Sequence, residues 1–157
     1  MRFQPIAVRT LVLFALAAPA AVCFADMSGP MNADEIKWGP APPVLPAGAK
    51  MAVLTGDPAG NGFVTVRLKM PAGYKIPPHW HPTDEHVTVL SGSLAIGMGD
   101  TLDKKQSKLL KVGGYGVAPA NMHHFAWTPA GATIELSLMG PLQVTYVNPA
   151  DDPSAKK

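Results

Sequence analysis

The sequence predicts an all-β sandwich or barrel formed by one domain. The chain has 157 residues, a length typical of a single domain. It contains 15 glycines and 17 prolines, about a fifth of all residues, which disfavours a helix bundle. Short apolar runs separated by turn residues recur along the chain, and no run has the period of a long amphipathic helix. Many short strands with frequent turns are typical of sandwiches and barrels.

The first 25 residues predict a secretory signal peptide. Arg2 and Arg9 precede an apolar run over residues 11–22, and Ala25 offers a small residue at the cleavage point. The run is shorter than the roughly 20 residues that a membrane helix needs, and a proline interrupts it. A retained membrane anchor is the alternative. A lipoprotein anchored through Cys23 is disfavoured, because the preceding Val22 is too large for the usual pattern.

Cleavage after Ala25 would change both the charge and the redox chemistry of the chain. The mature chain would keep 11 basic and 11 acidic residues, so its charge offers no reason to bind nucleic acid or anionic lipid. Cys23 would be lost, which excludes disulfide bonds, thiolate metal sites and cysteine catalysis. A chain without thiols suits an oxidising compartment. We therefore expect a periplasmic or secreted protein.

Three regions are expected in the mature chain. Residues 26–50 predict an extended proline-rich N-terminal arm, because five prolines exclude a helix or an interior strand. Residues 51–147 predict the β domain, and residues 148–157 a loose polar tail. Within the β domain, residues 100–108 predict a loop or a short helical turn. The expected strands are 51–54, 63–70, 85–90, 94–98, 108–112, 115–118, 124–128, 133–138 and 142–147.

Four polar side chains have the spacing of metal ligands. His79 and His81 are two residues apart, so an extended chain places both imidazoles on one face. A Pro-Thr-Asp bend then brings Glu85 to the start of the next strand. A further ligand is available from His123 or His124, of which only one can reach the same ion because adjacent strand residues face opposite ways.

These residues carry a resemblance to the cupin superfamily, in particular its small single-domain bacterial members. The spacing Gly73-x5-His79-x-His81-x3-Glu85-x6-Gly92 resembles the first cupin motif at every defining position. The spacing Gly113-x5-Pro119-x-Asn121-x2-His124 resembles the second. Asn121 replaces the usual glycine, and we expect it to adopt the left-handed conformation that asparagine tolerates. Thr128 stands where the second motif usually closes with asparagine.

The resemblance implies a double-stranded β-helix, which is a jelly-roll-like cupin barrel. It also implies one divalent metal ion bound by His79, His81, Glu85 and His124. Fe, Mn, Ni, Co, Cu and Zn are all acceptable to such a site. Three imidazoles and one carboxylate leave coordination positions open for water, dioxygen or a small oxygen ligand. The alternative is a cupin without metal, in which these side chains form a polar network.

The remaining candidates have simpler interpretations. His86 should face the surface, and Glu135 is a candidate base beside the metal or a solvent-facing strand residue. The methionines at 70, 98, 122 and 139 are expected in the core. A narrow hydrophobic pocket that suits a small organic acid or an aromatic ligand is expected from the residues Val87, Val89, Ile96, Val117 and Ala126.

Two functions are compatible with these residues. The first is a small-molecule metalloenzyme, dioxygenase-like or decarboxylase-like, for which no catalytic residue can be named. The second is a non-catalytic module that binds or senses a metal or a small ligand. A structural β domain would leave the histidine spacing unexplained. A homodimer is expected, because the outer strand faces need cover.

Overall fold

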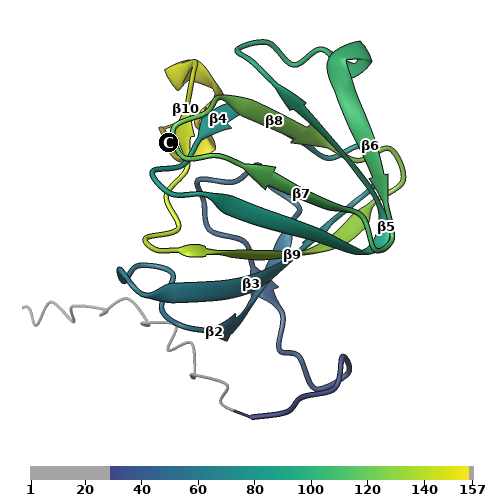
Figure 1. Ribbon diagram of the computed structural model, residues 1–157, viewed down its shortest axis with the longest axis vertical. Helices are drawn as coiled ribbons and strands as arrows, with labels where there is room; N and C mark the ends of the chain where they lie inside the picture. The colour runs from purple at the N-terminus through teal and green to yellow at the C-terminus, as the bar shows by residue number, and fades with distance from the viewer. Residues whose placement is uncertain (1–28, 156–157) are drawn as a thin grey trace, which may run out of the picture.

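A computed structural model describes residues 29–155 of the chain, and the predicted signal peptide lies outside this range. Strands dominate, which confirms the all-β prediction (Figure 1). No helix in the described part of the chain has the length and apolar character required to cross a membrane. The strands are β1 (Gly39–Pro40), β2 (Lys50–Thr55), β3 (Phe63–Met70), β4 (Lys75–Trp80), β5 (Glu85–Met98), β6 (Ser107–Lys111), β7 (Tyr115–Ala118), β8 (His124–Trp127), β9 (Ala132–Met139) and β10 (Thr145–Tyr146). There are also short 3-10 helices at Lys104–Gln106, Pro149–Asp151 and Pro153–Ala155.

The long strand β5 joins two antiparallel layers. Its first half pairs with β9 and β7, and β9 continues through β3 and β2 to β1. Its second half pairs with β6 and β8, and β8 continues through β4 to β10. Figure 1 shows β2, β3, β9 and β5 side by side, with β7, β8 and β4 above them in this view. This curled sheet is the jelly-roll-like barrel that the cupin resemblance implies.

Gly92 allows β5 to pass from one layer to the other. Its φ is +70°, in the left-handed region that glycine adopts easily. A Cβ at this position would collide with the carbonyl oxygen of Gly131. The sequence predicts two strands, 85–90 and 94–98, because Ser91-Gly92 has the composition of a turn. The structure has one bent strand with a bulge between Val89 and Ser91.

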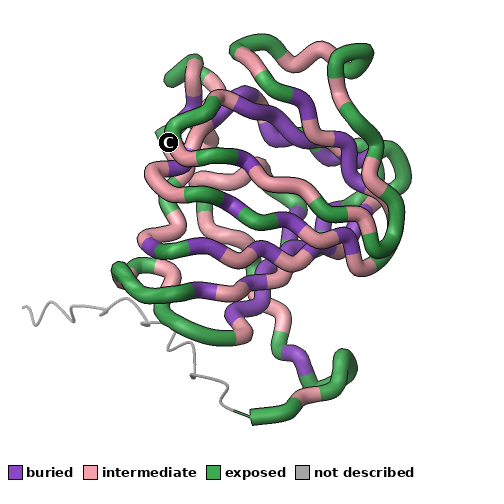
Figure 2. Tube along the Cα trace, in the orientation of Figure 1, coloured by how far each residue is buried: buried purple, intermediate pink, exposed green. Residues whose placement is uncertain are grey.

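The core lies between the two layers. In β3 and β9 every second side chain is buried, as an antiparallel strand with one solvated face requires (Figure 2). Of the four methionines expected in the core, only Met70 is buried there, at 3% exposure. Met98, Met122 and Met139 are 44–50% exposed, so the prediction for these three was wrong.

Strand β4 was not predicted, because its sequence contains Pro77 and Pro78. The two prolines occupy a register shift between the pairs Ile76–Ala126 and His79–His124. Proline lacks the N–H that a ladder requires, and a bulge removes that requirement. The carbonyl oxygens of both prolines remain in use: that of Pro77 accepts from His79, and that of Pro78 accepts from Val147.

The expected proline-rich arm at residues 26–50 is not confirmed. β1 pairs with β2, and Ile36 is buried at 8% exposure. The loop over residues 41–49 closes on itself through a hydrogen bond from Ala41 to Ala49. This loop packs against the barrel, where Val44 and Leu45 contact the hydrophobic core.

Candidate metal centre

Three strand ends bring the predicted ligand residues together. His79 lies in β4 and His81 directly follows that strand. Glu85 is the first residue of β5, and His124 is the first residue of β8. The pairing of β4 with β8 sets His79 directly opposite His124. All four side chains are buried, with exposures of 2–8%.

The three histidines form a compact group. One potential ligand nitrogen from each of His79, His81 and His124 lies within 4.8 Å of the other two. Two nitrogens bound to the same ion are at most about 4.2 Å apart, since each bond is about 2.1 Å long. The spacing is therefore close to that of a shared ion. Ring centroids are 4.2 Å apart for His79 and His124 and 4.9 Å apart for His79 and His81.

Each imidazole is held at Nδ1 by a backbone carbonyl oxygen. The acceptors are Pro77 for His79 at 2.8 Å, Gln143 for His81 at 2.6 Å, and Met122 for His124 at 3.0 Å. A neutral ring that donates from Nδ1 carries its lone pair on Nε2. Such a second hydrogen bond is the usual support of a metal-bound histidine.

Two of the opposite ring nitrogens lack partners. Nε2 of His81 and Nε2 of His124 are buried without any hydrogen bond. Buried polar atoms are nearly always satisfied, so two orphaned lone pairs in one small space require an explanation. A bound divalent cation would satisfy both atoms. The donor set therefore fits a metal ion.

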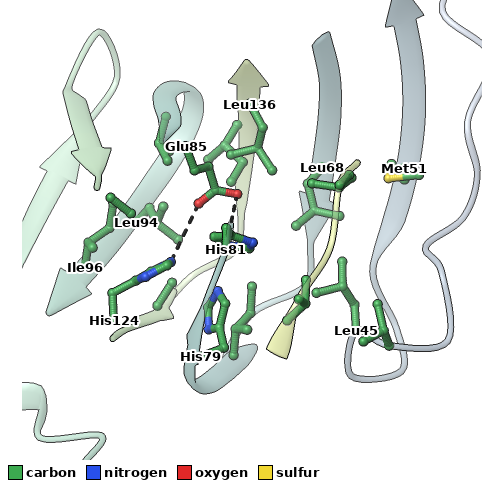
Figure 3. A pocket seen from close by; sticks show the side chains of 18 of the residues that line it. Leu45, Met51, Leu68, His79, His81, Glu85, Leu94, Ile96, His124 and Leu136 are labelled. Carbon is green, nitrogen blue, oxygen red and sulfur yellow. Dashed lines mark ion pairs between the residues drawn. The ribbon is translucent and has the colours of Figure 1, made fainter. Parts of the chain in front are cut away.

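Glu85 lies to one side of the imidazole group. Its Oε1 is 3.6 Å from Nε2 of His81, and its Oε2 is 3.8 Å from Nε2 of His124 (Figure 3). Both distances exceed hydrogen-bond length but suit neighbouring ligands of one ion. Within the described part of the chain, the group of ligand atoms that all lie within 4.8 Å of one another consists of the three histidines and does not include Glu85. The carboxylate thus faces two of the imidazoles.

The electrostatics favour the protonation states that a metal requires. Burial, together with the nearby His124 and His81, lowers the pKa of His79 to about 3. Burial raises the pKa of Glu85, but the three imidazoles outweigh this effect, so the pKa lies below its ordinary value. Neutral imidazoles and an ionised carboxylate are the forms that bind metal ions.

An apolar pocket opens beside the four side chains. Val87, Ile96 and Ala126 line it as predicted, whereas Val89 and Val117 do not. Val117 pairs with the exposed His86, on the outer face of the sheet. Two loops that the sequence did not place at the pocket complete its wall, through Pro42, Val44, Leu45, Leu142 and Val144. The cavity measures about 50 Å³.

The other predicted candidates lie outside the pocket. His123 is 2.6 Å from Asp100 through Nδ1 and is not part of the imidazole group. His86 is exposed, as predicted, and bonds to the Tyr115 hydroxyl. Glu135 forms an ion pair of 2.9 Å with Arg67 on the outer face of the sheet. It therefore cannot act as a base beside the metal, and the solvent-facing interpretation is the correct one.

Two buried tyrosines support the pocket and were not predicted. The Tyr146 hydroxyl donates to the Val44 carbonyl oxygen at 2.8 Å, and the Tyr74 hydroxyl donates to that of Pro46. They tie the loop over residues 41–49 to the barrel. Burial raises the pKa of Tyr74 to about 12. No sequence signal marks these residues, because a hydroxyl-to-carbonyl contact leaves no pattern in the chain.

Asn121 has the conformation expected from the second motif. Its φ is +61°, within the left-handed region. Its N–H donates to the carbonyl oxygen of His81 at 2.8 Å. The turn before β8 is thereby tied to the segment that carries two of the imidazoles.

A family model and one curated relative match this chain. The model describes ChrR cupin-like domains and matches residues 30–142. Germin-like protein 3-1 of Oryza sativa subsp. japonica is 35% identical over 81 residues. That match covers 51% of this chain and 36% of the rice protein, so the chain spans only about a third of this relative.

Solved structures with the same fold share little sequence with this chain. A candidate acetylacetone dioxygenase from Methylibium petroleiphilum PM1 has a TM-score of 0.60 and 22% identity, over 80% of this chain and 84% of that one. An RmlC-like cupin from Shewanella frigidimarina NCIMB 400 has a TM-score of 0.55 and 15% identity, over 69% and 87% of the two chains. At these identities the likeness shows the cupin fold alone.

Proposed function

This chain belongs to the family of ChrR cupin-like domains, and from that premise we propose that it binds one divalent metal ion through His79, His81, Glu85 and His124. The observation that carries the proposal is the pair of buried, unpartnered Nε2 atoms of His81 and His124. The backbone bonds at Nδ1 direct all three histidines to use Nε2. Three nitrogens and one oxygen suit Fe, Mn, Ni, Co, Cu or Zn.

The proposed role of the ion is to bind a small organic molecule in the apolar pocket. A bound ion of this kind polarises oxygen ligands and, where it is redox-active, supports reactions with dioxygen. The side chains that line the pocket orient the ligand and exclude water, because most of them are apolar. A dioxygenase-like enzyme is the catalytic form of the proposal, with decarboxylase-like chemistry as the related option, because three imidazoles and one carboxylate leave positions on the ion open beside the apolar pocket.

The second candidate function is a non-catalytic module that binds or senses a metal or a small ligand. One observation favours it. Among the described residues that line the pocket, Glu85 and the three histidines are the only side chains able to exchange a proton. If all four bind the ion, no separate acid or base remains beside it. Turnover would then depend on the ion alone.

Two further parts of the proposal concern the localisation of the protein and its oligomeric state. The basic and apolar pattern of residues 1–25 supports export to the periplasm or the exterior. Phe63, Tyr115 and Met139, each at least half exposed, lie on the outer face of the layer that contains β3, β9 and β7. They support a homodimer that covers this face.

Metal analysis of the mature protein tests the proposal. We expect about one divalent ion per chain in the wild type, and a large loss in His81→Ala and Glu85→Ala. The matched control is His123→Ala, which removes a neighbouring imidazole that pairs with Asp100 instead. Equal metal content in all four proteins would refute the assigned site. Incubation of the loaded protein with candidate substrates and dioxygen then separates the enzyme from the binding module.

A further inference from the structure

The pocket beside the proposed metal has an unusually uniform lining. Apart from His79, His81, Glu85 and His124, every lining residue is aliphatic, proline or methionine. None offers a hydroxyl, an amide side chain or an aromatic ring. A ligand in this pocket therefore finds side-chain hydrogen-bonding or coordinating partners only at the metal centre. Polar groups elsewhere on the ligand would be buried without such partners, at a large cost in free energy.

The pocket also lacks a positive side chain. None of the lining residues, all within residues 29–155, is lysine or arginine. Arg67 lies on the outer face and is paired with Glu135. The neighbouring Lys50, Lys69 and Lys75 are exposed. Within residues 29–155, the lining therefore offers a ligand no positive charge except the one that remains on the metal centre.

That remaining charge limits the charge of the ligand. A divalent ion with one ionised carboxylate and three neutral imidazoles carries one net positive charge. A ligand with a single negative charge neutralises the centre. A ligand with two negative charges leaves one of them uncompensated in an apolar environment, where unpaired charge is strongly disfavoured.

The volume limits the size of the ligand. The cavity of about 50 Å³ is small, which favours a ligand with a short body. The wall of this cavity includes side chains from two loops. These loops contribute Leu45, Leu142 and Val144, which are only partly buried. These side chains again suit a short aliphatic body.

We propose that this site takes small, singly charged oxygen chelators with an aliphatic body. The anion of a short branched 2-oxo acid and the enolate of a 1,3-diketone belong to this class. Dicarboxylates, phosphate esters and sugars do not. The proposal rests on the proposed function, because it assumes the metal at the four ligands.

Competition between two ligands of different charge provides the test. Mature protein is loaded with Co²⁺, its cobalt content is measured, and it is titrated by calorimetry with 3-methyl-2-oxobutanoate and with oxalate. In water oxalate is the stronger ligand for a divalent ion, because it carries twice the charge. We expect the protein to reverse this order and to bind the 2-oxo acid at least tenfold more tightly. Oxalate binding as tightly as the 2-oxo acid, or more tightly, would overturn the proposal.

A charge placed in the pocket wall gives a second measurement. Leu142→Lys adds a cation to the lining, and we expect the ratio of the two affinities to shift at least tenfold toward oxalate. Gln143→Lys is the matched control, because the exposed side chain of this residue does not line the pocket and the substitution keeps the backbone carbonyl oxygen that bonds to His81. Val144→Lys replaces Leu142→Lys if that variant does not fold. An equal shift in the pocket variant and the control would contradict the proposed role of charge.

The two proposals fail in different ways. Protein that retains no cobalt refutes the metal site itself. Protein that retains one cobalt per chain but prefers oxalate keeps the metal site and refutes the ligand class.

Discussion

The backbone carbonyl oxygen of Gln143 lies 2.6 Å from Nδ1 of His81, although the two residues are 62 positions apart in the chain. The residues on either side of Gln143, Leu142 and Val144, line the pocket. One hydrogen bond therefore orients a proposed metal ligand and also holds part of the pocket wall. The opposite loop is held in a similar way, by hydroxyls that donate to Val44 and Pro46. Hydrogen bonds thus connect both loops of the pocket wall to the barrel, and one of these bonds ends on a proposed metal ligand.

Removing one tyrosine hydroxyl should loosen the loop over residues 41–49, which forms part of the pocket wall. Tyr146→Phe deletes the bond to Val44 and leaves its carbonyl oxygen without this partner. We expect a loss of about 1–2 kcal/mol in the free energy of unfolding. We also expect faster removal of bound metal by a chelator, measured by stopped flow. The control is Tyr115→Phe, which deletes a hydroxyl bonded to the exposed His86. Equal chelation rates in the two variants would show that the loop does not limit access.

The metal-free protein should lose stability in acid. The pKa of His79 is about 3 in the folded protein and about 6.5 when unfolded, so the unfolded chain binds the extra proton between these values. The stability that neutral His79 contributes is present above pH 6.5 and falls as the pH decreases toward 3. The slope approaches about 1.4 kcal/mol per pH unit within this window. The lowered pKa of Glu85 acts in the same direction below its unfolded value of 4.5.

Urea denaturation at a series of pH values measures this effect. The profile of His79→Asn should be flatter than that of the wild type, because asparagine does not titrate. The matched variant is His123→Asn, which removes a neighbouring imidazole that pairs with Asp100 outside the buried group. Parallel profiles for wild type and His79→Asn would contradict the assignment of this slope to His79.

Alkaline conditions should release the loop over residues 41–49. The raised pKa of Tyr74 means that its neutral form stabilises the fold below the unfolded value of 10. This contribution is lost as the pH rises from 10 through about 12. Limited proteolysis between about pH 9 and pH 11.5 should show earlier cleavage within this loop than in the barrel strands. Tyr74→Phe should remove the part of the pH dependence that is due to this residue. Cleavage in the loop that does not change with pH would refute the role of Tyr74.

Gly92 should be far less tolerant of substitution than Gly113. Both have positive φ, at +70° and +78°, so alanine is strained at either position. Only at Gly92 does the added Cβ meet backbone, at the carbonyl oxygen of Gly131, whereas nothing lies within 4 Å of the corresponding atom at Gly113. We expect Gly92→Ala to cost more than about 3 kcal/mol and Gly113→Ala about 1 kcal/mol. Thermal unfolding of the two variants provides the measurement, and similar losses would contradict the bent-strand explanation.

Some predictions were wrong because the local sequence pattern is compatible with two different backbone structures. Pro77 and Pro78 exclude a regular ladder, yet a bulge accommodates them, so β4 was missed. Ser91-Gly92 has the composition of a turn, yet here it bends a continuous strand. Met98 and Met122 are apolar, yet they stand near strand ends where the core no longer covers them.

By itself the sequence determined the strand-rich fold and the group of residues from which a metal site can be built. Frequent glycine and proline prevent long helices. Side chains of an extended chain alternate between two faces, so His79 and His81 share one face. The tertiary structure alone decided which loops close the pocket and which carbonyl oxygens orient the imidazoles. Those contacts join positions such as His81 and Gln143, and local periodicity carries no information about neighbours that only folding brings together.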